Sequence, residues 1–163
     1  KAKWFNHEWI KSMLDEKCLE LVKPVLTNKG VAINDESYLL KVVSLVKDRC
    51  VLLNDFYEQS VYFFKSPESI DVESIKPKWS DEKAVFFTQF NTMIDGMDWN
   101  LHSIEESFKV LATEKNIKVG ELQLPFRIML VGAKFGPGVF QIAEMIGKDE
   151  TKSRIVKTLE LLK

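Results

Sequence analysis

Hydrophobic side chains recur at steps of three and four residues along nearly the whole chain, which is the spacing of helices with one buried face. The clearest example begins at Asn34, Asp35 and Glu36, where an N-cap residue and first-turn carboxylates precede an apolar series. The series consists of Leu39, Leu40, Val43, Val46, Cys50 and Leu53. It predicts a helix from Asp35 to about Val51. No segment alternates like a strand, so we expect an all-α fold.

The rest of the first third also has helical spacing. The segment Trp4 to Leu14 begins near Asn6, a good N-cap residue. The pattern continues to Leu26, and Pro24 is expected to bend or end that helix. The aromatic residues of Phe56 to Phe64 follow. They suit either a core or a surface on which bases stack, and their helical spacing favours the core.

The middle of the chain predicts a division into two parts. Ser66 to Lys78 holds two of the five prolines and shows little periodicity, which favours a hinge between helical subdomains at residues 1–70 and 71–163. Ser80 and Asn100 have the side chains of N-cap residues and are expected to begin two helices. The inward positions would be Val85, Phe86, Phe90, Met93 and Ile94 in the first, and Ile104, Phe108, Leu111 and Ala112 in the second.

The last third predicts three more helices around a glycine-rich turn. Pro125 is expected near the start of an apolar helix that ends at Gly132. A loop with the turn Gly136-Pro137-Gly138 follows, then a short helix from Val139 to about Gly147 and a final amphipathic helix from Lys148 to Lys163. The sequence therefore predicts a helical bundle of two packed subdomains.

Composition and charge narrow the possible partners. The net charge is −1, which disfavours a generic DNA-binding protein, and the two ends are slightly basic around an acidic middle. Cys18 and Cys50 are expected to be reduced, partly buried thiols of a cytoplasmic protein, and no metal-ligand spacing is present. No apolar run predicts a membrane helix. The abrupt start at Lys1, without an initiator Met, suggests a fragment.

The residue patterns of known catalytic sites are absent from the sequence. There is no Gly-x-Ser-x-Gly elbow and no nucleophile with an adjacent His signature. The pair Glu105-Glu106 points in two directions on a helix, and His102 is expected at the surface. The segment Gly132 to Gly138 superficially resembles a phosphate loop, but it follows a helix and lacks the Gly-Lys-Ser/Thr ending. We therefore expect no catalytic residue and no metal site.

Three arginines and one turn remain as binding candidates. Arg127 and Arg154 suit either a phosphate clamp or ion pairs with neighbouring helices, and the sequence leaves both open. Arg49, near the end of its predicted helix, could satisfy the helix dipole or present a planar donor fork to a base edge. The Gly136-Pro137-Gly138 turn exposes backbone N–H and C=O groups of the kind that read splayed single-stranded bases.

Several segments together resemble the C-terminal anticodon-binding region of bacterial glutamyl-tRNA synthetases. Lys3-Trp4-Phe5-Asn6 with Trp9-Ile10 resembles the entry to that region, and Tyr38 through Arg49 to Leu53 resembles its arginine-bearing helix. The tail is most specific. It has Pro125-Phe126-Arg127, Gly132, Gly136-Pro137-Gly138-Val139-Phe140, Ile146-Gly147-Lys148-Asp149-Glu150 and Arg154 in the family's order. Residues 66–100 carry little that is diagnostic.

The resemblance implies an all-helical, class I synthetase-type anticodon-binding cage whose two subdomains are residues 1–70 and 71–163. The parent enzyme would attach glutamate to tRNA-Glu in translation, using ATP and Mg²⁺ in an upstream catalytic domain. The His-Ile-Gly-His and Lys-Met-Ser-Lys-Ser motifs of that domain are absent here. The fragment itself would need no cofactor and bind the anticodon stem-loop, as part of a monomeric cytoplasmic protein without DNA or membrane partners.

The resemblance also implies site residues. Arg49 matches the arginine that reads the third anticodon base, and Pro137 and Val139 match loop residues that contact the other two. Gly136, Gly138 and Arg127 belong to the same motif. Gly136 and Val131 stand where the family has Thr, so this chain lacks both hydroxyls. The alternative function is a helical protein–protein interaction domain, which would use a groove lined by Phe56–Phe64.

Overall fold

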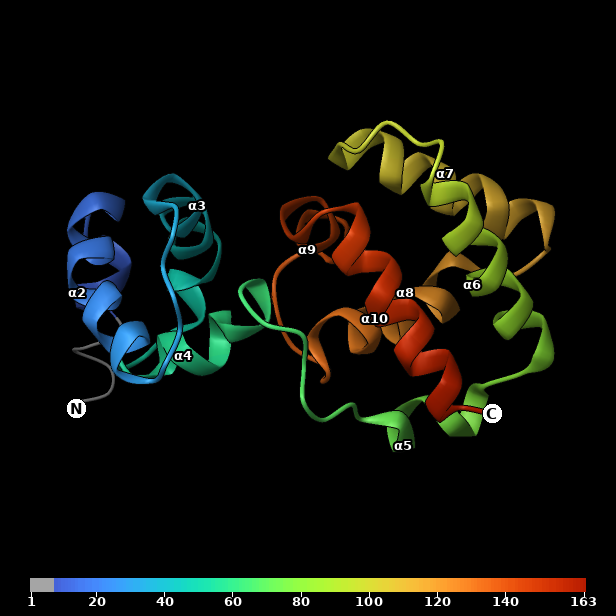
Figure 1. Cartoon of the computed structure of the whole chain (residues 1–163), viewed down its shortest axis with the longest axis horizontal. Helices are drawn as coiled ribbons and strands as arrows, with labels where there is room; N and C mark the ends of the chain where they lie inside the picture. The colour runs from blue at the N-terminus through green and yellow to red at the C-terminus, as the bar shows by residue number, and fades with distance from the viewer. Residues whose placement is uncertain (1–7) are drawn as a thin grey trace. The chain divides into compact units, whose positions relative to one another are not determined.

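The computed structural model describes residues 8–163, and within them every regular element is a helix (Figure 1). The expected all-α fold is therefore confirmed. The chain forms two compact units, residues 1–65 and 66–163, where the sequence had suggested a division at residue 70. The expected helix start near Asn6 lies outside the described residues.

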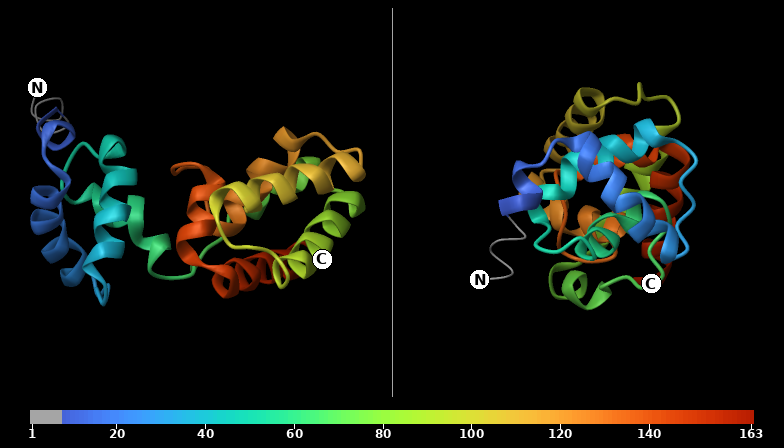
Figure 2. Two further views of the ribbon diagram at one scale, coloured as in Figure 1. Left: turned by 90° about the horizontal axis from the view of Figure 1, so that it is seen from above. Right: turned by 90° about the vertical axis from the view of Figure 1, so that its left-hand side faces the viewer.

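The first unit packs around α2 (Asp15–Asn28), α3 (Glu36–Val46) and α4 (Asp55–Ser60), after a helical stretch at residues 8–12. Both views of Figure 2 show α2 beside α3. Asp35 caps α3 as expected, because its Oδ1 accepts the N–H groups of Ser37 and Tyr38 at 2.9 and 3.3 Å. The helix stops at Val46 rather than Val51, and the 3-10 turns η1 (Lys47–Arg49) and η2 (Val61–Phe63) complete the unit.

Helix α2 does not end at Pro24 but continues through it to Asn28. A proline inside a helix leaves the carbonyl four residues earlier without its donor. Here that residue is Glu20, and both Glu20 and Pro24 are exposed, so water can satisfy the carbonyl. The aromatic segment Phe56–Phe64 belongs to the core, with Phe56, Tyr62 and Phe63 all at most 4% exposed. This burial favours the core interpretation of the segment over a binding surface.

The second unit contains the short α5 (Val72–Ile75) and η3 (Lys76–Lys78), followed by α6 (Asp81–Ile94), α7 (Leu101–Glu114), α8 (Val119–Val131), α9 (Val139–Ile146) and α10 (Lys148–Leu161). Ser80 and Asn100 cap α6 and α7, each accepting a backbone N–H three residues later. The inward face of α6 was partly misjudged, since Val85 is 51% exposed. Pro125 lies inside α8 rather than near its start, because the apolar face begins earlier at the buried Leu122.

An aromatic core holds the second unit together. Phe108 lies at its centre, with ring centroids 5.0–5.2 Å from four other phenylalanine rings: Phe86, Phe90, Phe126 and Phe140. Such pairs add about 0.5–1.5 kcal/mol each to the burial of apolar area. Helix α10 packs against α6 and α8, and α9 packs against α7 and α8 (Figure 1). The core thereby fixes the two helices, α8 and α9, that flank the Gly136-Pro137-Gly138 turn.

Candidate RNA-binding site

Arg49 projects from a turn that is fixed on both sides. Just before it, the Lys47 ammonium forms an ion pair with Asp15 at 2.7 Å and donates to the Met13 carbonyl at 2.8 Å. Just after it, Cys50 is fully buried and its N–H donates to the Lys47 carbonyl at 3.2 Å. The Arg49 side chain itself is exposed, and its guanidinium has no partner among the described residues. Its donors are therefore available to a ligand from a defined position.

The two cysteines near this turn, Cys18 and Cys50, are buried. Burial is the largest factor that raises the pKa of both thiols, and it brings the pKa of Cys50 to about 12, with smaller contributions from Asp55 and Cys18. Both thiols are thus protonated near neutral pH and unsuited to nucleophilic chemistry. They act as small apolar residues in the core of the first unit.

The Gly136-Pro137-Gly138 turn is also held from both ends, within the second unit. Upstream, α8 ends at Gly132 in the left-handed region (φ 90°), and its carbonyl accepts the Asp71 N–H at 2.9 Å. Downstream, Val139 and Phe140 are only 5% and 6% exposed, because they open α9 against the aromatic core. The turn is therefore ordered before any ligand arrives.

Arg127 of α8 binds the backbone of the turn. Its Nη1 donates to three successive carbonyls, those of Phe135, Gly136 and Pro137, at 3.4, 3.0 and 2.6 Å. These bonds give Arg127 a role in shaping the loop, beside the phosphate clamp and the carboxylate pair that the sequence left open. Because hydrogen bonds to a charged donor are worth about 1.5–3 kcal/mol, this one side chain stabilises much of the turn.

We expect Arg127→Ala to loosen the turn without unfolding the unit. Loss of charge-assisted bonds worth about 1.5–3 kcal/mol should speed amide hydrogen exchange in residues 133–138 by roughly 10- to 100-fold. Protection in α6 and α7 should stay unchanged. Lys134→Ala, which removes an exposed cation from the same loop, is the matched control and should leave exchange as in the wild type. Unchanged loop exchange in Arg127→Ala would contradict the role of the carbonyl contacts.

Arg154 was expected either to clamp phosphate or to pair with a carboxylate. In the structure it pairs with the carboxylate of Glu150. It is 1% exposed, its Nε donates to Glu150 at 2.9 Å on its own helix, and its Nη1 donates to the Leu130 carbonyl at 2.6 Å. The Leu130 carbonyl belongs to the last turn of α8, where intrahelical donors run out. Arg154 therefore caps α8 from α10 and is buried away from phosphate.

The residues of the turn differ in what they present to solvent. Gly136 and Pro137 are buried, whereas Gly138 is exposed. Gly136 has a φ of 122°, a conformation that side chains rarely adopt. The Thr of the family pattern would be strained in this conformation. The backbone at position 136 therefore favours glycine, and the Thr hydroxyl is missing for the same reason. A ligand at this turn can therefore reach the backbone of Gly138 and the side chain of Lys134, which are both exposed.

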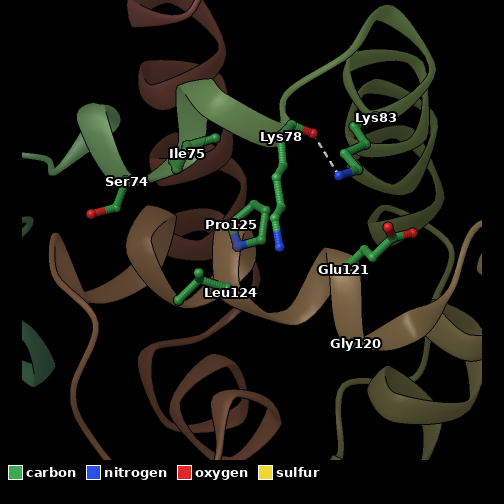
Figure 3. Close-up of a pocket in the computed structure, with 8 residues that line it drawn as sticks. All are labelled: Ser74, Ile75, Lys78, Lys83, Gly120, Glu121, Leu124 and Pro125. Atoms are coloured by element: carbon green, nitrogen blue, oxygen red, sulfur yellow. Dashed lines mark hydrogen bonds between the residues drawn. The ribbon is translucent and has the colours of Figure 1, made fainter.

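A pocket of about 130 Å³ lies elsewhere in the second unit, between η3 and the first half of α8 (Figure 3). Lys83 is only 8% exposed, and its ammonium donates to the Lys78 carbonyl at the rim of the pocket at 2.6 Å. The volume is below the roughly 300–1,000 Å³ of small-molecule sites. Across residues 8–163 the structure brings no three metal-binding side chains together, and His102 pairs with Glu106 at the surface at 2.9 Å.

The family follows from comparison with known proteins. The model of the anticodon binding domain matches residues 17–159. This chain belongs to that family. The anticodon-binding domain is 39% identical over 163 residues to the glutamate–tRNA ligase of Flavobacterium psychrophilum, covering 99% of the chain and 32% of that protein. The chain thus spans about a third of the length of the curated relatives it matches.

Solved structures agree with this assignment. The anticodon-binding domain superposes on a crystal structure of a glutamate tRNA ligase from Elizabethkingia meningosepticum with a TM-score of 0.90 and 38% identity, covering 99% of this chain and 32% of that one. The glutamate-tRNA synthetase of Elizabethkingia anophelis gives 0.84 and 35%, covering 97% and 31%. The expected class I synthetase-type fold is therefore confirmed. No helix within residues 8–163 is long and apolar enough to span a membrane.

Proposed function

We propose that this anticodon-binding domain recognises the anticodon of tRNA-Glu as the C-terminal part of a glutamate–tRNA ligase. The observation that carries the proposal is the contrast among the three arginines. Arg127 and Arg154 donate to backbone carbonyls of their own unit. Arg49 holds an exposed guanidinium, without a partner among the described residues, on a fixed turn. A planar donor fork held in this way suits the edge of an unstacked base.

The remaining parts of the proposal concern the parent protein. A catalytic domain upstream would use ATP and Mg²⁺ to activate glutamate, and no residue of this chain is assigned to either. The parent would act as a monomer in the cytoplasm, and the two buried, protonated thiols suit the reducing conditions of that compartment. The net charge of −1 fits recognition through a few placed side chains rather than a broad basic field.

A titration of the 163-residue chain with anticodon stem-loops tests the proposal. We expect weak but measurable binding of the tRNA-Glu stem-loop at low salt, and weaker binding when the third anticodon base is changed. Arg49→Ala should lose about 1–3 kcal/mol of binding to the cognate stem-loop and most of its preference at that base. Arg49→Lys keeps the charge but not the fork and should also lose the preference.

Lys41→Ala provides the control, since Lys41 is an exposed cation on α3 of the same unit. It should weaken binding slightly and equally for both stem-loops, as a loss of charge alone would. Absence of binding at low salt would overturn the proposed function. Binding that is equal for both stem-loops, or insensitive to Arg49→Ala, would overturn only the role of Arg49.

A further inference from the structure

Beside the exposed Gly138, Gln141 presents a polar side chain that has no partner among residues 8–163. The Oε1 atom of Gln141 lies 2.9 Å from the point that a Cβ on Gly138 would occupy, so the amide rests against this glycine. Gln141 is partly exposed and makes no side-chain hydrogen bond to any residue in the described part of the chain. The amide thus keeps both its donor and its acceptor.

The turn offers few other polar side chains. Gly136 and Gly138 have none, and Pro137, Val139 and Phe140 are buried apolar residues. Lys134 supplies a charge, which attracts phosphate but does not distinguish one base from another. Gln141 is therefore the nearest side chain able to read a base that is laid against Gly138, since an amide can pair with a base edge through one donor and one acceptor.

We propose that Gln141 is a specificity-determining residue, which contacts the base placed at the Gly136-Pro137-Gly138 turn and takes over the polar role that Gly136 cannot fill. The inference rests on the proposed function. Glycine at position 138 leaves room for the Gln141 amide. A Cβ there would displace the amide, whereas the backbone itself would tolerate it, because the φ of Gly138 is −54°.

A purely structural role is the competing explanation. Gln141 is the third residue of α9, the position from which glutamine reaches back to the N-cap in a capping box. In this helix the side chain leans toward Gly138 but forms no bond with its N–H. A capping role would change the stability of α9 and would act on all RNA ligands alike.

The test uses the full 163-residue chain and four stem-loops, the tRNA-Glu sequence and single changes at each of the three anticodon positions. Gln141→Ala should weaken the cognate stem-loop about 10-fold and should abolish the preference at one anticodon position while leaving the other two. Gln141→Glu, which removes the donor, should alter the preference at the same position. Gly138→Ala should reproduce part of the loss by displacing the amide.

Gln89→Ala is the matched control, because it removes an exposed glutamine from α6 of the same unit, and it should bind like the wild type. Equal weakening of all four stem-loops by Gln141→Ala, together with faster hydrogen exchange in α9, would assign Gln141 to capping and overturn the inference. Unchanged binding would overturn it as well. If the wild type bound none of the stem-loops, the proposed function itself would fail, and the two failures are therefore distinguishable.

Discussion

Replacing Gly132 by alanine should destabilise the second unit by roughly 2–5 kcal/mol. Two effects add. A left-handed backbone costs a non-glycine residue about 1–2 kcal/mol, and Gly132 has a φ of 90°. The new Cβ would also lie 2.6 Å from the Ser69 carbonyl oxygen and 2.8 Å from the Cβ of Pro67. Relieving such an overpacked contact costs about 1–3 kcal/mol more.

Gly147→Ala separates the two effects. Gly147 has nearly the same φ, 91°, and belongs to the same unit, but nothing lies within 4 Å of a Cβ added there. With a ψ of 169° its backbone lies in a region that is essentially confined to glycine, so the variant should cost only the conformational part, about 1–3 kcal/mol. Urea unfolding of the 163-residue chain labelled with 5-fluorotryptophan, followed at Trp99, reports on this unit, because the Trp99 Nε1 donates to Ala143 of α9 at 3.1 Å. Equal losses in the two variants would show that the segment at Pro67 yields freely.

The contact at Gly132 also bears on the binding turn. The segment 66–71 docks on the end of α8 through the Asp71 N–H, and the Lys157 ammonium of α10 donates to the Pro67 carbonyl at 2.8 Å. A displaced segment would move the residue from which the turn starts. We therefore expect that Gly132→Ala also weakens stem-loop binding under conditions where the unit remains folded, and that Gly147→Ala does so less.

Helix caps and helix ends could be predicted from the sequence where residues close along the chain determine them. Asp35, Ser80 and Asn100 cap helices because a short polar side chain reaches N–H groups two or three positions away. Gly132 ends α8 because only glycine enters the left-handed region without strain. The end of α3 was missed by five residues, since Asp55 takes the N–H groups of Val51 and Leu52, each at 2.9 Å, and holds them out of the helix.

The partners of the arginines could not be predicted in the same way. Arg127 donates to carbonyls eight to ten residues away, and Arg154 to one 24 residues away. Every residue carries a carbonyl, so no side-chain pattern identifies these acceptors in the sequence. The resemblance identified the family that the comparisons confirm, but the exposed fraction of each side chain emerged only from the fold. Gln141 was missed for this reason, because its position beside Gly138 depends on a rotamer.

Arg154→Met should be the most destabilising change among the charged residues. Methionine fills much of the buried volume but leaves the Leu130 carbonyl, otherwise bonded at 2.6 Å, without this donor at the end of α8. A buried acceptor without a partner costs about 1–3 kcal/mol, and the lost pair with Glu150 adds to it, so we expect a loss of about 3 kcal/mol. The same fluorotryptophan unfolding experiment measures it.

Glu150→Gln isolates the contribution of the ion pair. The Glu150 side chain is 40% exposed and glutamine still offers an oxygen to the Arg154 Nε, so the loss should be within about 1 kcal/mol. The two variants should differ in a second respect. Removal of the cap frees the last turn of α8, which directly follows Arg127, the residue that binds the carbonyls of the Gly136-Pro137-Gly138 turn. Hydrogen exchange in residues 133–138 should therefore rise in Arg154→Met and remain near the wild-type rate in Glu150→Gln, whereas equal exchange in both would place the cap and the turn in independent parts of the unit.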